Sequence, residues 1–168
     1  MSDADASPKP VIPADPLATG GRVLVGVDDS PDAAIALRWA LREAIVRQAT
    51  LEVVHAWQPP MSALPFGGTL VVPVDEAEID EAARDHLDKL VDEAIAELEV
   101  DAPEVVRTAL PGAAALTLID LSAEADLLVV GSHGRTGWRK LMLGSVADAV
   151  VQHATCPVVV VRLPRGDD

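Results

Sequence analysis

The stretch Leu127-Leu-Val-Val-Gly-Ser-His-Gly134 is an apolar run that ends in glycine and polar residues. Consecutive apolar residues are typical of a strand buried on both faces, as in a parallel sheet that helices cover on each side. Gly131 and Gly134 allow a tight turn that leaves room for phosphates and brings backbone N–H groups within reach of an anion. Gly144-Ser145 then begins a predicted helix whose first N–H groups and dipole favour a phosphate. The stretch therefore predicts a buried strand followed by an anion-binding loop.

The rest of the chain alternates apolar strands with helices. Ser30 is a good N-cap, and Pro31 suits the first position of a helix. Residues 61–75 are rich in Pro and Gly and have no clear period, so we expect a loop there. The predicted strands are Arg22–Val27, Thr50–Trp57, Glu104–Leu110, Asp126–Val130 and Pro157–Arg162, and the predicted helices are Asp32–Gln48, Glu78–Glu99, Gly112–Ala125 and Ser145–His153. This alternation indicates an α/β three-layer sandwich with a mostly parallel sheet.

Length and composition limit the possible functions. At roughly 150 residues per domain, 168 residues make about one domain, which we place at residues 21–163 between a Pro-rich, disordered tail (residues 1–20) and a short C-terminal tail (residues 164–168). The 13 Lys and Arg against 27 Asp and Glu give a net charge of −14, which argues against nucleic acid and anionic membranes as partners. The N-terminus lacks the features of a signal peptide, and the single Cys156 forbids an internal disulfide, so we expect a cytoplasmic protein.

The glycine loop differs in charge from the rest of the chain. No Asp or Glu occurs between Asp126 and Asp148, whereas Arg135, Arg139 and Lys140 lie in that window. Ser132 and Ser145 add hydroxyl donors. In open parallel sheets, ligands bind beyond the carboxyl ends of the strands, where the chain order reverses. Asp28 follows the first strand. It either contacts the ligand or has a structural role, in which it supports the start of the next helix or pairs with a basic side chain of the loop.

Together these motifs resemble the universal stress protein family. Gly131-x-x-Gly134, nine further residues and then Gly144-Ser145 match the ATP-binding signature of that family. Val25-Gly-Val-Asp28-x-Ser30, Val54-His-Ala56 and Pro157-Val-Val-Val-Val161 are also similar. The resemblance covers about residues 21–162. It implies a five-stranded parallel sheet in the order 3-2-1-4-5, like that of the adenine nucleotide alpha hydrolases, with the first strand beside the fourth.

The resemblance also implies a ligand and an assembly. ATP-binding members hold adenine and ribose at positions that here are Gly26, Val27, Asp28 and Ala56, and Val130 and Gly131 line the same pocket. The phosphates lie on the loop, usually with Mg²⁺ or Mn²⁺ bridging them, at positions that here are Ser132, His133, Gly134, Arg135, Gly144, Ser145 and Val146. The last strand, Pro157–Arg162, is then an edge strand through which family members commonly form a homodimer.

Other functions fit the sequence less well. A receiver domain needs an Asp at the end of the third strand and a Lys at the end of the fifth, and both are missing here. A P-loop hydrolase needs a Lys before the Ser of Gly144-Ser145. His133 and Asp28 are the candidates for a water-positioning base, and neither has an orienting partner that the sequence reveals. We therefore expect no catalytic residue and no cluster of protein metal ligands, and a nucleotide-dependent stress-response module is favoured. A cyclic AMP-binding protein and a slow ATPase are the alternatives.

Overall fold

The structure is a computed structural model that describes residues 19–59, 61–63, 69–71, 75–99, 101–134 and 143–163. The two predicted tails, apart from residues 19 and 20, lie outside these ranges. So do Arg135, Arg139 and Lys140 of the glycine loop.

A five-stranded sheet forms the centre of the fold. Its strands are β1 (Arg22–Gly26), β2 (Thr50–Trp57), β5 (Val105–Pro111), β6 (Leu127–Gly131) and β7 (Val158–Val161). Their order is β5-β2-β1-β6-β7, and every neighbouring pair in it is parallel. These are the third, second, first, fourth and fifth strands of the sheet along the chain, so the predicted order 3-2-1-4-5 is confirmed.

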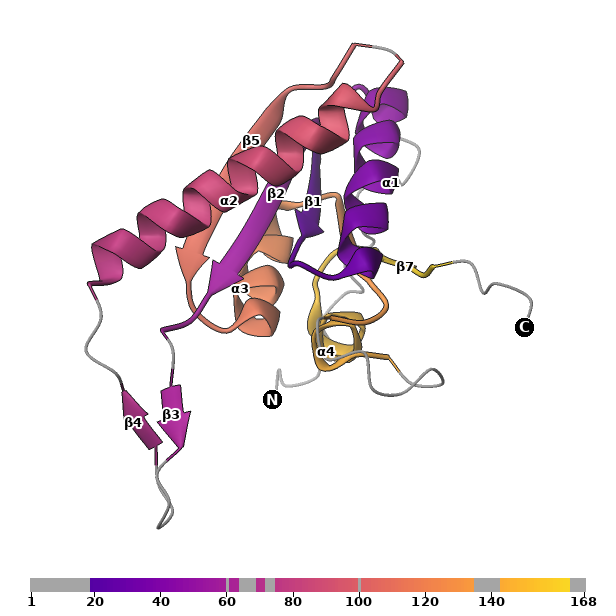
Figure 1. The fold of residues 1–168 in the computed structure, drawn as a ribbon. Helices are drawn as coiled ribbons and strands as arrows, with labels where there is room; N and C mark the ends of the chain where they lie inside the picture. Colours follow the sequence, from indigo (N-terminus) through magenta and orange to yellow (C-terminus); the bar gives the residue numbers. More distant parts are fainter. Residues whose placement is uncertain are drawn as a thin grey trace, which may run out of the picture.

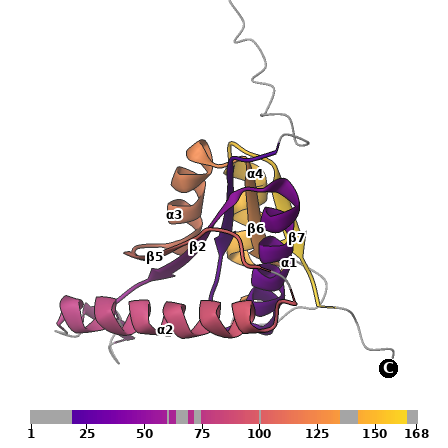
Figure 2. The ribbon, with the colours of Figure 1, turned by 90° about the horizontal axis from the view of Figure 1, so that it is seen from above.

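Helices cover both faces of the sheet. On one face lie α1 (Pro31–Arg47) and α2 (Glu76–Ala96), and on the other lie α3 (Ala114–Leu121), followed by a 3₁₀ turn at Ser122–Glu124, and α4 (Ser145–His153) (Figures 1 and 2). Each face has its own core, because neighbouring strand residues such as Val53 and Val54 point to opposite sides. No helix in the described part of the chain is both long enough and apolar enough to span a membrane.

Capping residues decide where the helices begin. The Ser30 hydroxyl accepts a hydrogen bond from the Ala33 N–H at 3.2 Å, and Pro31 follows as the first helical residue, as predicted. Helix α2 begins at Glu76, two residues before the predicted start, because the Asp75 carboxylate accepts the Ala77 N–H at 3.0 Å. Both starts show that one short polar side chain sets the first turn of a helix.

The loop predicted at residues 61–75 is wrong in part. Residues Met61–Ala63 (β3) and Thr69–Val71 (β4) pair as antiparallel strands. Three-residue strands are too short to show a period in the sequence. The intervening sequence, which contains Pro65, Gly67 and Gly68, consists largely of turn-forming residues. Figure 1 shows this hairpin projecting away from the sandwich.

Candidate functional site

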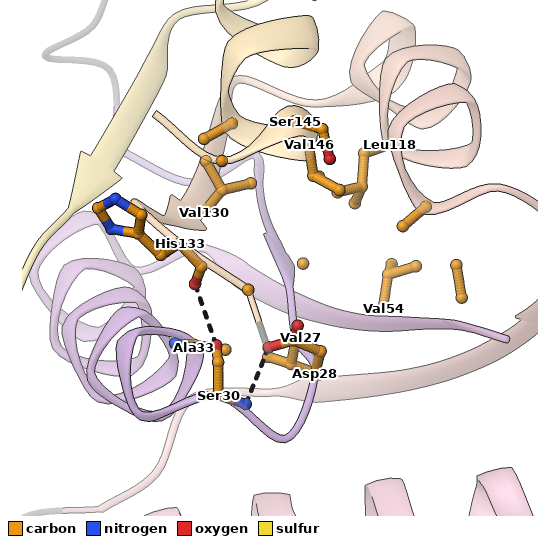
Figure 3. A pocket seen from close by; sticks show the side chains of 17 residues that line it. Val27, Asp28, Ser30, Ala33, Val54, Leu118, Val130, His133, Ser145 and Val146 are labelled. Carbon is orange, nitrogen blue, oxygen red and sulfur yellow. Dashed lines mark hydrogen bonds between the residues drawn. The ribbon is translucent and has the colours of Figure 1, made fainter. Parts of the chain in front are cut away.

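A pocket lies at the carboxyl ends of β1, β2 and β6, bordered by α3 and by the first turns of α1 and α4 (Figure 3). Its volume is about 670 Å³ with its open mouth included. Strand β1 has β2 on one side and β6 on the other, so the pocket is at the point where the strand order reverses. Open α/β sheets bind ligands at this point.

The predicted site residues come together at this pocket, with two exceptions. Arg135 lies outside the described residues, and Ser132 is fully buried with its hydroxyl directed at Asp32. The predicted residues that line the pocket are Gly26, Val27, Asp28, Ala56, Val130, Gly131, His133, Gly134, Gly144, Ser145 and Val146. The lining residues that the sequence did not reveal are Ser30, Ala33, Val54, Ala114, Leu118 and Ala147. Ser30 and Val54 belong to motifs quoted above but were not assigned to the site. Nothing in the sequence distinguishes the small or apolar remainder from other core residues.

The floor of the pocket is apolar. Val54 from β2, Leu118 from α3 and Val130 from β6 meet there, each from a different element. A Cβ atom on Gly26 would lie 2.5 Å from Leu118 Cδ1, so the glycine allows Leu118 to lie against the end of β1. This floor suits a flat, apolar ring system.

The opposite side of the pocket offers hydrogen-bond donors. Helix α4 begins there, and its N-cap residue, Gly144, has no side chain to satisfy the first N–H groups. The first turn of a helix has no intrahelical acceptors for its N–H groups, and the helix dipole adds a partial positive charge at that end. Ser145, the exposed first residue of α4, adds a hydroxyl (Figure 3). This side of the pocket is suited to an anion.

Asp28 supports the start of α1 and faces the glycine loop. Its Oδ1 atom accepts a hydrogen bond from the Ser30 N–H at 3.0 Å (Figure 3). Its Oδ2 atom would lie 3.0 Å from a Cβ atom on Gly134. Of the two roles expected for Asp28, support of the helix start is present in the structure.

Asp32 contacts the residues that follow β6, and sequence reasoning did not single it out. Its Oδ2 atom accepts the Ser132 hydroxyl at 2.6 Å and the His133 N–H at 3.1 Å, and its exposed fraction is 7%. The glycine loop therefore does have a carboxylate beside it, although its own sequence window contains none. The only signal in the sequence was an acidic residue in the first turn of a helix, which is common for electrostatic reasons alone.

His133 has orienting partners, which corrects the expectation from the sequence. Its Nδ1 atom lies 2.8 Å from the Ser132 Oγ atom and 3.4 Å from Asp32 Oδ2. Its carbonyl oxygen accepts the Ser30 hydroxyl at 3.2 Å (Figure 3). Helix α1 thus holds His133 through both its side chain and its backbone.

Gly131 allows close packing of β6 against α1. A Cβ atom at this position would lie 2.8 Å from the Asp32 carbonyl carbon and 2.9 Å from the Ala33 nitrogen. Both are backbone atoms of α1, which cannot move unless the helix itself shifts. The expectation that this glycine leaves room for phosphates is therefore incomplete, because its immediate neighbour is a helix backbone.

The family model of the universal stress proteins matches residues 21–162. The chain belongs to the universal stress protein family. A universal stress protein of Mycobacterium tuberculosis strain H37Rv is 38% identical over 145 residues, which cover 83% of this chain and 47% of that protein. The chain thus spans about half the length of this relative.

Solved structures of universal stress proteins share the fold. UspA from Lactobacillus plantarum has a TM-score of 0.64 and 26% identity, with 86% of this chain and 99% of that chain covered. A universal stress protein in complex with cAMP has a TM-score of 0.59 and 25% identity, with 86% and 98% covered. One from Archaeoglobus fulgidus in complex with dAMP has a TM-score of 0.57 and 25% identity, with 84% and 97% covered.

This universal stress protein domain also has a second, more open hollow. It lies between the end of α1 and the segment before β5, and Gln48, Thr50, Asp101 and Glu104 are among its lining residues. The Thr50 hydroxyl donates a hydrogen bond to Glu104 at 3.2 Å. The lining contains no basic side chain, so the hollow is unsuited to an anion.

Proposed function

We propose that this universal stress protein domain binds ATP, with Mg²⁺ or Mn²⁺ bridging the phosphates, and acts as a nucleotide-dependent stress-response module in the cytoplasm. One observation carries the proposal: a single pocket joins an apolar floor to the uncapped N-terminus of α4. A nucleotide needs both, because its base is flat and largely apolar and its phosphates are anionic.

The base would lie on the floor formed by Val54, Leu118 and Val130. Gly26 and Val27 border that floor at the end of β1, where a side chain on Gly26 would displace Leu118. The phosphates would then extend toward Gly134 and Ser145 at the other side. The direction of the nucleotide follows from which side of the pocket is apolar and which carries the donors.

The donor set fits a metal ion that arrives with the nucleotide. Among the described residues, no group of three or more His, Cys, Asp or Glu side chains could hold a metal. Mg²⁺ usually takes one or two carboxylates together with phosphate oxygens and water. Asp28 is the carboxylate in the pocket lining and would help to hold the metal. When bound, the metal supplies the positive charge that offsets the phosphates next to this carboxylate.

We propose a regulatory module in preference to an enzyme. Hydrolysis requires a side chain that orients water at the terminal phosphate. The two candidate bases are both engaged within the protein: His133 Nδ1 lies 2.8 Å from the Ser132 Oγ atom, and Asp28 Oδ1 accepts the Ser30 N–H (Figure 3). Slow turnover of ATP is the alternative that a direct assay of phosphate release would detect.

Cyclic AMP is the second candidate ligand. Two similar solved structures are complexes of adenine nucleotides with a single phosphate, cAMP and dAMP. Such a ligand would use the same floor but fewer of the donors at Gly134 and Ser145, and it would need no metal.

Calorimetric titration of the protein with ATP and with cyclic AMP, each with and without Mg²⁺, tests the proposal. We expect ATP to bind with a dissociation constant of micromolar order, about −8 kcal/mol, and more tightly with Mg²⁺ than without it. Tighter binding of cyclic AMP that is independent of Mg²⁺ would favour the second candidate. Absence of heat with both nucleotides would contradict nucleotide binding altogether.

A further inference from the structure

We propose that Asp32 is a positioning residue that holds the root of the phosphate-binding loop, defined as residues 131–133, and fixes the orientation of His133. The inference rests on the proposed function and deepens it, because it separates the residues that hold the loop from those that contact phosphate.

The polar groups of Ser132 are all engaged within the protein. Its N–H donates to the Val161 carbonyl at 2.7 Å, and its carbonyl accepts the Gly144 N–H at 2.8 Å. Its hydroxyl donates to Asp32 at 2.6 Å. Ser132 therefore connects β7, the start of α4 and α1, and it has no donor left for a ligand.

The backbone of His133 is engaged in the same way. Its N–H donates to Asp32 at 3.1 Å, and its carbonyl accepts the Ser30 hydroxyl at 3.2 Å. Both partners belong to the start of α1. The donors that remain for phosphate begin at Gly134 on the loop and at Ser145 on α4, which both line the pocket.

The single hydroxyl proton of Ser132 determines which nitrogen of the His133 ring carries a hydrogen. A serine hydroxyl carries one proton, and here Ser132 donates that proton to the Asp32 Oδ2 atom at 2.6 Å. The Ser132 oxygen is then the acceptor toward the His133 Nδ1 atom at 2.8 Å, so Nδ1 carries a hydrogen. The resulting chain runs from the His133 Nδ1–H through the Ser132 hydroxyl to the Asp32 carboxylate.

Burial makes this chain a rigid support. Ser132 is 0% exposed and Asp32 is 7% exposed, and hydrogen bonds are stronger in such low-dielectric surroundings. The dipole of α1 further favours a carboxylate in its first turn. The apolar floor belongs to the core on the opposite face of the sheet, under α3 and α4. Loss of Asp32 should therefore disturb the phosphate end of the pocket and leave the base end intact.

Titration with Mg²⁺–ATP and with adenosine separates the two ends of the pocket. Asp32→Ala leaves a buried hydroxyl and a buried N–H without an acceptor, so we expect ATP affinity to fall tenfold or more and adenosine affinity to stay within about twofold. Asp32→Asn, which keeps an acceptor oxygen, should show a smaller loss in the same direction. Asp120→Asn, at an exposed site on α3, is the matched control and should change neither affinity.

The outcomes distinguish this inference from the proposed function. Wild type that binds neither ATP nor adenosine would overturn both. Wild type that binds ATP, together with a folded Asp32→Ala variant that keeps the wild-type ratio of the two affinities, would overturn the positioning role alone. If Asp32→Ala does not fold, the ratio of ATP affinity to adenosine affinity in Asp32→Asn and Ser132→Ala tests the positioning role instead.

Nitrogen-15 NMR of the His133 ring provides a second readout that a merely structural role would not affect. We expect a proton on Nδ1 in the wild type, and a change in the ring nitrogen shifts in Asp32→Asn and Ser132→Ala. A wild-type ring with an unprotonated Nδ1 would contradict the hydrogen-bonded chain.

Discussion

Ser145 is the residue whose side chain should contribute most directly to phosphate binding. It is exposed at the first position of α4 and lines the pocket, and the N-cap of α4 is Gly144, so the Ser145 hydroxyl has no capping role to lose. Ser145→Ala removes one donor to a charged acceptor, which costs about 1.5–3 kcal/mol, or roughly a tenfold to hundredfold loss of ATP affinity. Calorimetry should show this loss for ATP with an unchanged melting temperature. Unchanged ATP affinity would show that the hydroxyl points elsewhere.

Gly131 and Gly134 should respond differently to the same substitution. Gly131→Ala places a Cβ atom 2.8 Å from the α1 backbone, so we expect about 1–3 kcal/mol of destabilisation from the strain between β6 and α1. At Gly134 the nearest atom to a new Cβ, among the residues that the structure describes, is Asp28 Oδ2 at 3.0 Å, the end of a side chain. Gly134→Ala should therefore keep nearly wild-type stability and weaken ATP binding. Thermal unfolding of both variants tests this difference, and equal melting temperatures would contradict it.

Cys156 should be a slow nucleophile in the folded protein. Burial raises the pKa of its thiol above the ordinary value, and Asp126 raises it further. Because the thiolate is the reactive form, a raised pKa lowers the reactive fraction near neutral pH. We expect iodoacetamide to modify Cys156 more slowly at pH 8 in the native protein than in the protein unfolded in guanidinium, by mass spectrometry. Equal rates in the two states would contradict this.

A charged pair connects the first two strands of the sheet. Arg22 on β1 pairs with Glu52 on β2, and the Thr108 hydroxyl on β5 donates to the same carboxylate at 2.8 Å. Glu52 is 6% exposed, so removal of Arg22 leaves a nearly buried charge. We expect Arg22→Ala to lower the free energy of unfolding by about 2–3 kcal/mol, less than for a fully buried pair, because the Arg22 side chain is 27% exposed.

Arg84→Ala is the control for that pair. Arg84 bonds Asp80 one turn away on α2 and is 66% exposed, and such surface pairs contribute roughly 0.5 kcal/mol. Urea unfolding of the two variants compares a pair between strands with a pair on the surface. Similar losses in both would show that the Arg22–Glu52 pair does not stabilise the sheet.

Short sequence motifs predicted where helices and strands begin. They did not predict which residues from different elements contact one another. The Ser30-Pro31 pair identified the start of α1, and apolar runs identified buried strands such as β1, β6 and β7, because caps and buried strands are encoded by adjacent residues. Asp32 was not predicted as a contact of the glycine loop, because its hydrogen bonds with Ser132 and His133 join residues that are far apart in the sequence. The short β3–β4 hairpin was not predicted because three-residue strands carry no detectable period.

The strand β7 lies at one edge of the sheet, and we expect it to carry an interface. Its four valines, Val158–Val161, are all half-buried, and no charged side chain interrupts them. At the other edge, Arg107 on β5 pairs with Asp88 and Asp92 of α2, so that edge carries charges. An uncharged apolar edge strand tends to pair with another strand. We therefore propose a homodimer in which β7 meets the same strand of a second copy.

Analytical ultracentrifugation of a Val159→Lys variant tests that interface. We expect a dimeric wild type and a monomeric variant, because the lysine places a charge in the middle of the edge. Val46→Lys is the control, since Val46 is 75% exposed on α1 and is not part of the edge strand. A monomeric wild type, or a Val159→Lys variant that remains dimeric, would show that β7 is not the interface.

We propose that a nucleotide binds across the pocket with its phosphates at the start of α4. Backbone amide NMR of the ¹⁵N-labelled protein during titration with ATP and Mg²⁺ tests this placement. We predict the largest shifts at Gly134, Ser145 and Val146, with further shifts at Gly26 and Val27 under the base. No shifts, or shifts confined to the second hollow around Gln48 and Glu104, would contradict the claim.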